Sequence, residues 1–236
     1  MSVDPVSGGV VAVLFDLDGT LLDHEGAAGE ALQLWLPSLG LTADDEFLER
    51  WLLVEQRHLA DWRAGRITWD EQRRRRLREM LPAEAVGTTD EAADALFAGY
   101  LGAYEASWRV FEDVRAVLDI LERRQVRLGV LTNGTIRQQQ AKLTAVGLAD
   151  RFEFVLTTEE LGAAKPDPVV YLAACDRFDL RPAHVLHVGD LPDLDVTAAE
   201  AAGLHAVLID RADQHQHAGS LRSLEALPDH LAVLNR

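Results

Sequence analysis

The chain has 236 residues, of which 48% are hydrophobic, so it can form one large domain or two modest ones with a real core. Its formal net charge of −16 argues against nucleic-acid binding, which needs a basic face. Cys175 is the only cysteine, which excludes an intrachain disulfide and favours a cytoplasmic location. The sequence shows neither a signal-peptide pattern nor an apolar run of membrane-spanning length, so we expect no membrane partner.

The first predicted element is a buried strand that ends in two acids. Residues 10–15 are apolar without alternation, which is typical of a strand covered on both faces of a parallel sheet. Asp16 and Asp18 follow, and Gly19 lets the chain turn. Paired acids there need a metal ion or hydrogen bonds to compensate them, and open parallel sheets bind ligands at this edge. Two solvated acids at an ordinary turn are the alternative.

From residue 22 to residue 108 the apolar spacing is helical. Four helices are predicted, over residues 28–39, 43–63, 68–81 and 88–104. Capping-box sequences beginning at Thr68 and Thr88 open the last two. The arginine run 73–76 is assigned to a solvated surface, because four consecutive residues point all round a helix. The tryptophans at positions 35, 51, 62 and 69 of this block are assigned to its core.

Beyond residue 109, predicted strands and helices alternate. The strands are expected over residues 126–131, 152–156, 184–188 and 205–209. Such alternation indicates right-handed βαβ units and a doubly wound parallel sheet of about five strands. The predicted fold class is therefore α/β. Residues 1–21 and 109–236 are expected to form a Rossmann-like core, and residues 22–108 an all-helical cap domain inserted into it.

Three further polar segments lie at predicted strand ends or in the loops beyond them. They are Leu-Thr-Asn-Gly at 131–134, Ala-Lys-Pro-Asp-Pro at 164–168, and His-Val-Gly-Asp at 187–190 followed by Asp195. With Asp-Leu-Asp-Gly-Thr-Leu at 16–21, they resemble the four ordered motifs of the haloacid dehalogenase-like (HAD) superfamily. Singly, each also fits a turn, a helix cap or a surface loop. The chain looks most similar to the capped phosphatases of the nucleotidase and N-acylneuraminate-9-phosphatase-like group.

The resemblance implies a Mg²⁺-dependent phosphomonoester hydrolase. Its expected substrate is a small phosphorylated metabolite, such as a nucleotide or a sugar phosphate, and its expected intermediate is an aspartyl-phosphate. It assigns catalysis to Asp16 and Asp18; phosphoryl binding to Thr132, Asn133 and Lys165; Mg²⁺ to Asp16, Asp190 and the main-chain carbonyl of Asp18; and supporting roles to Gly19, Gly134 and Asp195. Asp16 would be the nucleophile, ionised at neutral pH if its pKa were the ordinary value of about 3.9. Asp18 would protonate the leaving alcohol and then deprotonate water.

The resemblance also leaves alternatives. Leu191 and Leu194 stand where many relatives carry Ser and Asn, which puts two hydrogen bonds near the metal in doubt. Dehalogenases of the superfamily lack the second acid, because a halide leaves without a proton, so Asp18 favours phosphate chemistry. A phosphosugar mutase of the same fold and a non-catalytic HAD-fold binding protein remain open, although a binding protein needs no nucleophile. The oligomeric state is expected to be a monomer or a homodimer.

Overall fold

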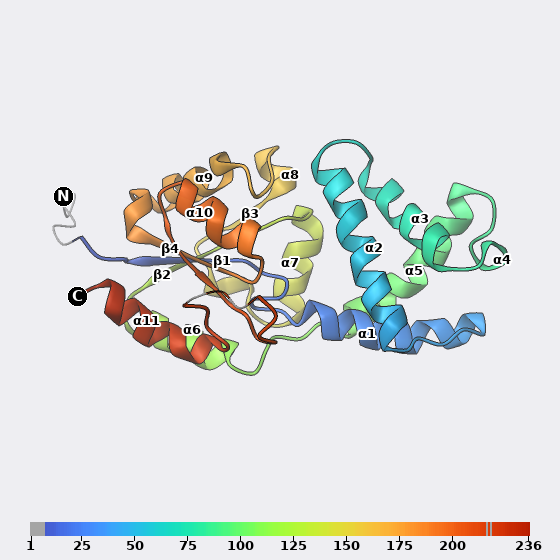
Figure 1. Ribbon diagram of the computed structural model, residues 1–236, viewed down its shortest axis with the longest axis horizontal. Coiled ribbons are helices and arrows are strands. Elements are labelled where there is room, and N and C mark those ends of the chain that lie inside the picture. The colour runs from blue at the N-terminus through green and yellow to red at the C-terminus, as the bar shows by residue number, and fades with distance from the viewer. Residues whose placement is uncertain (1–7, 216, 218) are drawn as a thin grey trace. The chain divides into compact units, whose positions relative to one another are not determined.

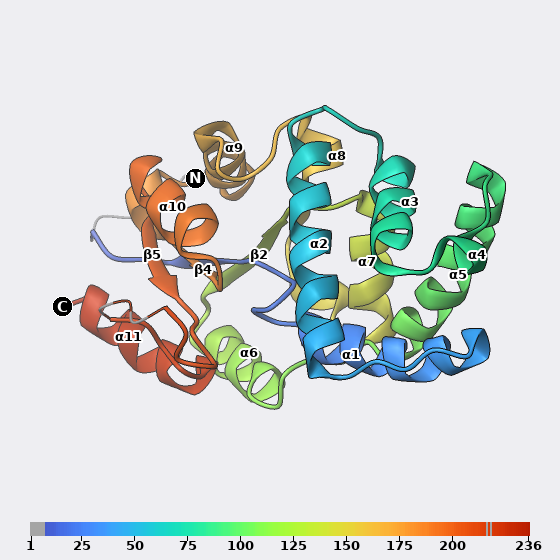
Figure 2. The ribbon, with the colours of Figure 1, turned by 45° about the vertical axis from the view of Figure 1, so that its right-hand side comes forward.

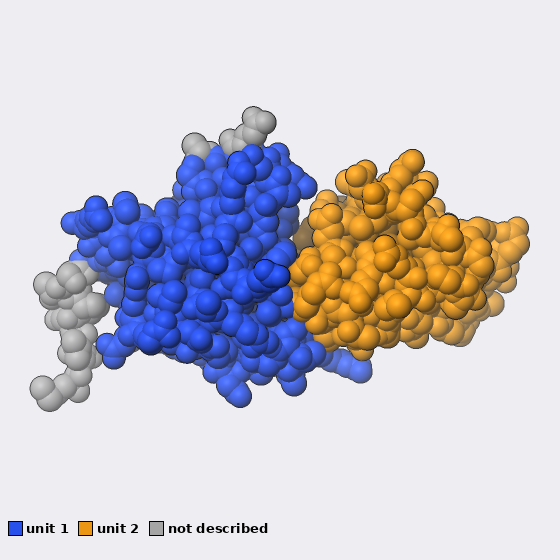
Figure 3. All heavy atoms as spheres, turned by 90° about the horizontal axis from the view of Figure 1, so that it is seen from below, with its two compact units in different colours: residues 1–22, 110–236 blue, residues 23–109 orange. Residues whose placement is uncertain are grey.

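The computed structural model describes residues 8–215, 217 and 219–236. The chain forms two compact units, which Figure 3 shows in different colours. One contains Met1–Leu22 and Val110–Arg236, and the other is Asp23–Arg109. Each boundary lies one residue beyond the predicted one. The first seven residues of the predicted core domain lie outside the described residues.

A five-stranded parallel sheet forms the centre of the first unit (Figure 1). Its strands, in the spatial order β3-β2-β1-β4-β5, are β1 (Ala12–Phe15), β2 (Arg127–Thr132), β3 (Val155–Thr157), β4 (Val185–Gly189) and β5 (His205–Leu208). This confirms the predicted doubly wound α/β class. Since β1 lies between β2 and β4, the residues that follow these three strands meet at one edge of the sheet.

Helices cover both faces of the sheet (Figures 1 and 2). The helices are α6 (Val114–Arg123), α7 (Ile136–Ala145), α8 (Thr158–Leu161), α9 (Pro168–Phe178), α10 (Ala198–Ala201) and α11 (Leu227–Leu234). α9 and α10 lie together on one face, and α6 packs with α11 on the other. The buried residues of α6 recur at helical spacing, and Asp167 caps α9 as predicted by accepting the Val169 N–H at 3.0 Å.

Several short elements were not predicted. They are α4 (Ala83–Val86), α8, a π-helical segment at Pro192–Thr197, and the 3₁₀ turns Ala149–Arg151, Pro182–His184 and Leu224–Ala226. None exceeds six residues, which is too short for an apolar period to be visible in the sequence. Among the described helices, none is both long enough and apolar enough to cross a bilayer.

The second unit is entirely helical in its regular structure. It contains α1 (His24–Trp35), α2 (Asp45–Arg63), α3 (Trp69–Met80), α4 (Ala83–Val86) and α5 (Asp90–Ala106). Thr68 caps α3 as predicted, whereas α5 is capped by Thr89 and not Thr88. Trp35 and Trp51 are buried in its core, while Trp62 and Trp69 are only partly buried and pack on each other at 4.7 Å between ring centres.

The prediction of a solvated surface for the arginine run is wrong for Arg76. Its side chain is buried, with the guanidinium carbon 5.0 Å from the ring centres of both Trp51 and Phe97. It also pairs with Glu55, whose side chain is 12% exposed, whereas Arg74 pairs with Asp94 at the surface. The ring faces attract the cation and Glu55 neutralises it, which offsets the cost of burying the charge.

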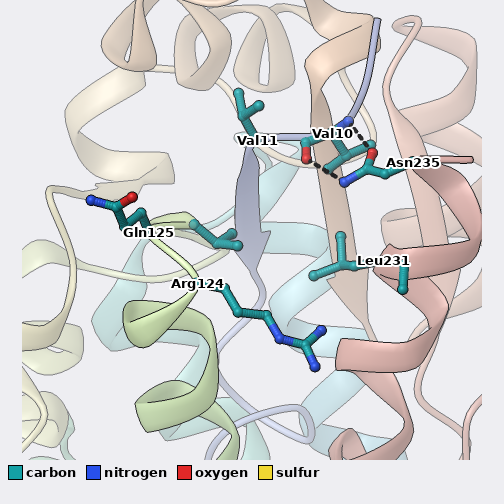
Figure 4. A pocket seen from close by; sticks show the side chains of 8 residues that line it. Val10, Val11, Arg124, Gln125, Leu231 and Asn235 are labelled. Atoms are coloured by element: carbon teal, nitrogen blue, oxygen red, sulfur yellow. Dashed lines mark hydrogen bonds between the residues drawn. The ribbon is translucent and has the colours of Figure 1, made fainter. Parts of the chain in front are cut away.

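A pocket of about 270 Å³ lies beside the amino end of β1 (Figure 4). The side-chain amide of Asn235 accepts the Val10 N–H at 2.6 Å and donates to the Val10 carbonyl at 3.0 Å. These two hydrogen bonds attach the end of the C-terminal helix to the chain leading into β1. Because Asp16 follows the carboxyl end of the same strand, the pocket is not a candidate for the chemistry of the acids.

Asp113 joins the start of α6 to the C-terminal part of the chain. Its carboxylate accepts hydrogen bonds from Arg211, the Ser223 hydroxyl and the Leu224 N–H, each at 2.8 Å. Burial alone would raise the pKa of Asp113. The hydrogen bonds and the charge of Arg211 outweigh that effect and hold the pKa below its usual range.

We expect Asp113→Ala to lower the free energy of unfolding by about 2–3 kcal/mol at neutral pH, because it leaves buried donors without an acceptor. The loss should shrink as the pH falls below about 4, since a depressed carboxyl pKa stabilises the fold only above that range. Urea unfolding at several pH values measures both. Asp119→Ala is the control, because its pair with Arg151 is half-exposed and worth below about 1 kcal/mol. Equal losses in the two variants would contradict the prediction.

Candidate active site

Lys165 joins two buried acids at the carboxyl edge of the sheet. Its Nζ lies 2.5 Å from Oδ1 of Asp16, directly after β1, and 2.6 Å from Oδ1 of Asp195, in the π-helical segment. Lys165 is only 3% exposed and Asp16 6%. The structure thus brings together three of the predicted site residues, and the ammonium is shared between two carboxylates.

Asp190 completes a group of three carboxylates. One oxygen each from Asp16, Asp190 and Asp195 lies within 4.8 Å of the others. Gly19 makes this close approach possible: its φ is +87°, and a Cβ there would lie 2.2 Å from Oδ2 of Asp190. A side chain at this position would therefore be strained and would also displace the acid.

The surroundings separate the pKa values of the three acids. Burial raises the pKa of Asp16 to about 7, with the charge of Lys165 opposing and that of Asp195 adding to the shift. Burial and the charge of Asp16 also raise the pKa of Asp190. For Asp195 burial acts in the same direction, but Lys165 and His187 bring its pKa below the usual range. The expectation of an ordinary pKa for Asp16 is wrong, because the strand end is buried among like charges.

The donor set fits a hard divalent cation. Asp195 already accepts the Lys165 ammonium, His187 Nε2 at 3.0 Å and the Leu191 N–H at 3.0 Å. Asp16 and Asp190 have fewer partners, and burial among neighbouring carboxylates raises the pKa of both. A cation between these two would stabilise both anions, and carboxylate oxygens are the ligands that Mg²⁺ prefers.

Asp18 takes a different partner. Both of its carboxylate oxygens lie near Nζ of Lys142, at 2.7 and 2.6 Å, and Gln139 Nε2 lies 3.3 Å from Oδ2. The same Gln139 nitrogen donates to Oγ1 of Thr132, at the end of β2, at 3.0 Å. Gln139 and Lys142 lie three residues apart on α7 and are both buried. Contribution of the Asp18 main-chain carbonyl to a metal remains a prediction.

Sequence reasoning missed Gln139 and Lys142. Polar residues on a helix are normally assigned to its solvated face, so the pattern of α7 did not mark them. One signal was present in the composition: Lys142 and Lys165 are the only lysines among the 23 Lys and Arg residues. Each lysine pairs with one acid of the first motif: Lys165 with Asp16 and Lys142 with Asp18.

Asn133 acts on the lysine loop through its side chain. Oδ1 accepts the Lys165 N–H at 2.9 Å and the Thr158 hydroxyl at 3.1 Å, while Nδ2 donates to the Lys165 carbonyl at 3.0 Å. These bonds hold the loop that carries the ammonium. Because both polar atoms of the Asn133 side chain are engaged in these bonds, only its main-chain N–H remains as a candidate for the predicted phosphoryl binding.

The two unusual leucines contribute through their main chains. The N–H of Leu191 donates to Oδ2 of Asp195, and the carbonyl of Leu194 accepts the hydroxyl of Tyr171. Main-chain bonds do not depend on the side chain, so the leucines are compatible with an ordered Asp195.

The comparisons with known proteins agree with the motifs. Residues 10–203 match the model of the haloacid dehalogenase-like hydrolases, and the chain belongs to this hydrolase family. It is 32% identical to the ribulose-1,5-bisphosphate 5-phosphatase of Halopiger xanaduensis over 208 residues, 86% of each chain. It is 33% identical to the phosphoserine phosphatase of Thermus thermophilus over 177 residues, 75% of this chain and 68% of that protein.

A solved structure extends the similarity to another activity. The 2-haloacid dehalogenase from Pseudomonas syringae pv. Tomato is 32% identical, with a TM-score of 0.66, and the match covers 95% of this chain and 99% of that one. The predicted superfamily is thus confirmed, while the nucleotidase-like group remains a prediction.

We expect Gly189→Ala to disrupt the site by displacing Asp195. A Cβ at this last residue of β4 would lie 2.1 Å from Cγ of Asp195, so the carboxylate must leave Lys165. The free energy of unfolding should fall by about 1–3 kcal/mol or more in urea titrations. Gly102→Ala in α5 is the matched control, because no atom lies within 4 Å and the change should be neutral or stabilising. A Gly189→Ala protein as stable as the control would show that Asp195 can move freely.

Proposed function

We propose that the chain is a Mg²⁺-dependent phosphomonoester hydrolase that works through an aspartyl-phosphate. The observation that carries the proposal is the different environment of two acids two residues apart. Asp16 is buried on Lys165 beside Asp190, while Asp18 is partly exposed and held by Lys142. A nucleophile and a proton-transfer group are thereby separated within one turn.

In the proposed reaction, a carboxylate oxygen of Asp16 attacks phosphorus and the bond to the leaving oxygen breaks. Asp18, which carries a proton when the substrate binds, gives that proton to the leaving oxygen. It then takes a proton from the water that hydrolyses the aspartyl-phosphate, which returns both acids to their starting states. Asp16 and Asp190 would hold Mg²⁺, whose charge would offset the repulsion between the phosphoryl group and the carboxylates.

We assign the phosphoryl oxygens to three groups. They are the hydroxyl of Thr132, the main-chain N–H of Asn133 and the ammonium of Lys165. The ammonium would serve the substrate while it remains fixed by Asp195. Such preorganised donors supply much of the rate in phosphoryl transfer, because they need no reorganisation as charge develops.

Net charge and the similar proteins support the proposed substrate class. Two phosphatases that act on small metabolites align over most of this chain, which supports a small phosphorylated metabolite, such as a sugar phosphate or a nucleotide. The net charge of −16 disfavours nucleic acid as a substrate. Cytoplasmic location and a monomeric or homodimeric state remain predictions.

Asp18 argues against dehalogenase activity, despite the similarity to a dehalogenase structure. Cleavage of a carbon–halogen bond releases a halide that needs no proton, so a buried lysine holding a second acid would have no function there. Turnover of p-nitrophenyl phosphate with no release of halide from 2-chloropropionate favours the phosphatase. A requirement for a hexose bisphosphate would indicate a phosphosugar mutase. Absence of turnover with every phosphoester would indicate a non-catalytic binding protein.

We expect Asp16→Asn to lower kcat on p-nitrophenyl phosphate by about 10³-fold or more, because an amide keeps the shape but is a poor nucleophile. Circular dichroism should show an unchanged fold. Asp193→Asn is the control, since it makes the same change at an exposed acid nearby and should keep full activity. Activity of Asp16→Asn above a few per cent of wild type would remove Asp16 from the nucleophile role.

We expect EDTA to abolish activity, Mg²⁺ to restore it and Ca²⁺ to inhibit. Ca²⁺ accepts more ligands than the tight octahedron of Mg²⁺, so it can engage both oxygens of Asp16 and hinder attack. Mg²⁺ should also raise the thermal midpoint of the wild type but not of Asp190→Asn, because only a bound ion stabilises the fold. Full activity in EDTA would refute the metal assignment while leaving Asp16 as the nucleophile.

A further inference from the structure

We propose that Gln139 and Lys142 are positioning residues, which hold the Asp18 carboxylate and the Thr132 hydroxyl in a fixed relation to each other. One buried face of α7 would then set both proton transfer and phosphoryl binding. This inference rests on the proposed function, because it gives a purpose to two side chains that contact the proton-transfer acid Asp18 and the phosphoryl-binding Thr132.

Lys142 fixes the position of the acid. Its ammonium contacts both oxygens of Asp18, at 2.7 and 2.6 Å, and its side chain is 4% exposed against 27% for Asp18. A single compact ammonium on both oxygens restrains both side-chain torsions of the aspartate. Because the lysine is buried, separating the two members of this ion pair is strongly unfavourable.

The choice of lysine is itself informative. Every other cationic side chain of the Lys and Arg class is arginine, except Lys165 on Asp16. Arginine presents a rigid planar fork, whereas the lysine ammonium is a point charge with three rotatable donors. The lysine ammonium can therefore contact both oxygens of Asp18 without the coplanar approach that a guanidinium fork requires.

Gln139 connects the acid to the phosphoryl-binding hydroxyl. A carboxylate only accepts hydrogen bonds, so the Gln139 atom that faces Asp18 must be the amide nitrogen. The same nitrogen donates to Oγ1 of Thr132 at 3.0 Å. The threonine oxygen is thus an acceptor from Gln139, and its own hydrogen can be donated to a phosphoryl oxygen.

The geometry shows that the amide is placed for these two contacts. Among the described residues, the Oε1 atom of Gln139 is buried without a hydrogen-bond partner, an arrangement that costs stability. In addition, a Cβ on Gly134 would lie 2.5 Å from Gln139 Nε2 and 3.0 Å from Cδ. The glycine of the second motif therefore leaves the space that the glutamine side chain occupies.

Two aryl substrates of similar shape test the role of Lys142. Phenyl phosphate needs a proton for its leaving oxygen, while p-nitrophenyl phosphate needs far less help. We expect Lys142→Met to lower kcat/KM on phenyl phosphate at least about tenfold more than on p-nitrophenyl phosphate. Arg137→Met, an exposed cation on the same helix, should leave both values unchanged.

Inhibition by inorganic phosphate tests the role of Gln139. Gln139→Leu should weaken this inhibition by about tenfold, the loss of one oriented donor, and lower kcat/KM on both substrates alike. Gln140→Leu, an exposed glutamine next to it, should change neither. Lys142→Met should bind phosphate normally, which separates the two functions.

A double-mutant cycle gives a readout that needs no turnover. Asp18→Asn and Lys142→Met, alone and together, are unfolded in urea with EDTA present. The pairing predicts non-additive losses of stability. Equal loss on both substrates in Lys142→Met, unchanged phosphate inhibition in Gln139→Leu, or an additive cycle would overturn the inference. An inactive wild type would instead refute the proposed function, and the cycle would still decide whether the acid is held.

Discussion

The core of this protein depends on one ammonium that holds buried negative charge in place. Lys165 contacts Asp16 and Asp195, and Asp190 lies close enough to raise the electrostatic cost further. Carboxylates at this depth are unfavourable unless compensated. The raised pKa values of Asp16 and Asp190 show that compensation by the protein alone is incomplete. An environment of this kind favours a cation and then an anionic substrate bound to it.

The sheet explains why these groups meet. β1 is the central strand, so a residue that follows it has neighbours from β2 on one side and from β4 on the other. Thr132 is the last residue of β2, Asp190 directly follows β4, and Asn133 ties the Lys165 loop to the same edge. Most of the site therefore stands on strand ends and on hydrogen-bonded main chain, which gives it the rigidity that preorganised catalysis requires.

The sequence predicted the sheet, the helical unit and most of the residues at this edge, because each leaves a local mark. An unbroken apolar run precedes Asp16, and Gly19 follows the second acid at a turn. Lys142 and Arg76 left no such mark. Each is a polar side chain on the inner face of a helix, where a periodic pattern assigns solvent. The partner of Lys142 lies 124 residues away, and only the folded chain brings Asp18 to it.

Burial of both lysines has a chemical consequence. Lys142 and Lys165 are each 3% exposed, and both ammonium groups lie on carboxylates. Reagents that acylate amines meet no accessible lysine on the folded chain, whose exposed cationic surface is made of guanidinium groups. Acylation of a lysine would therefore accompany opening of the catalytic edge. The extent of lysine labelling becomes a direct measure of how often that edge comes apart.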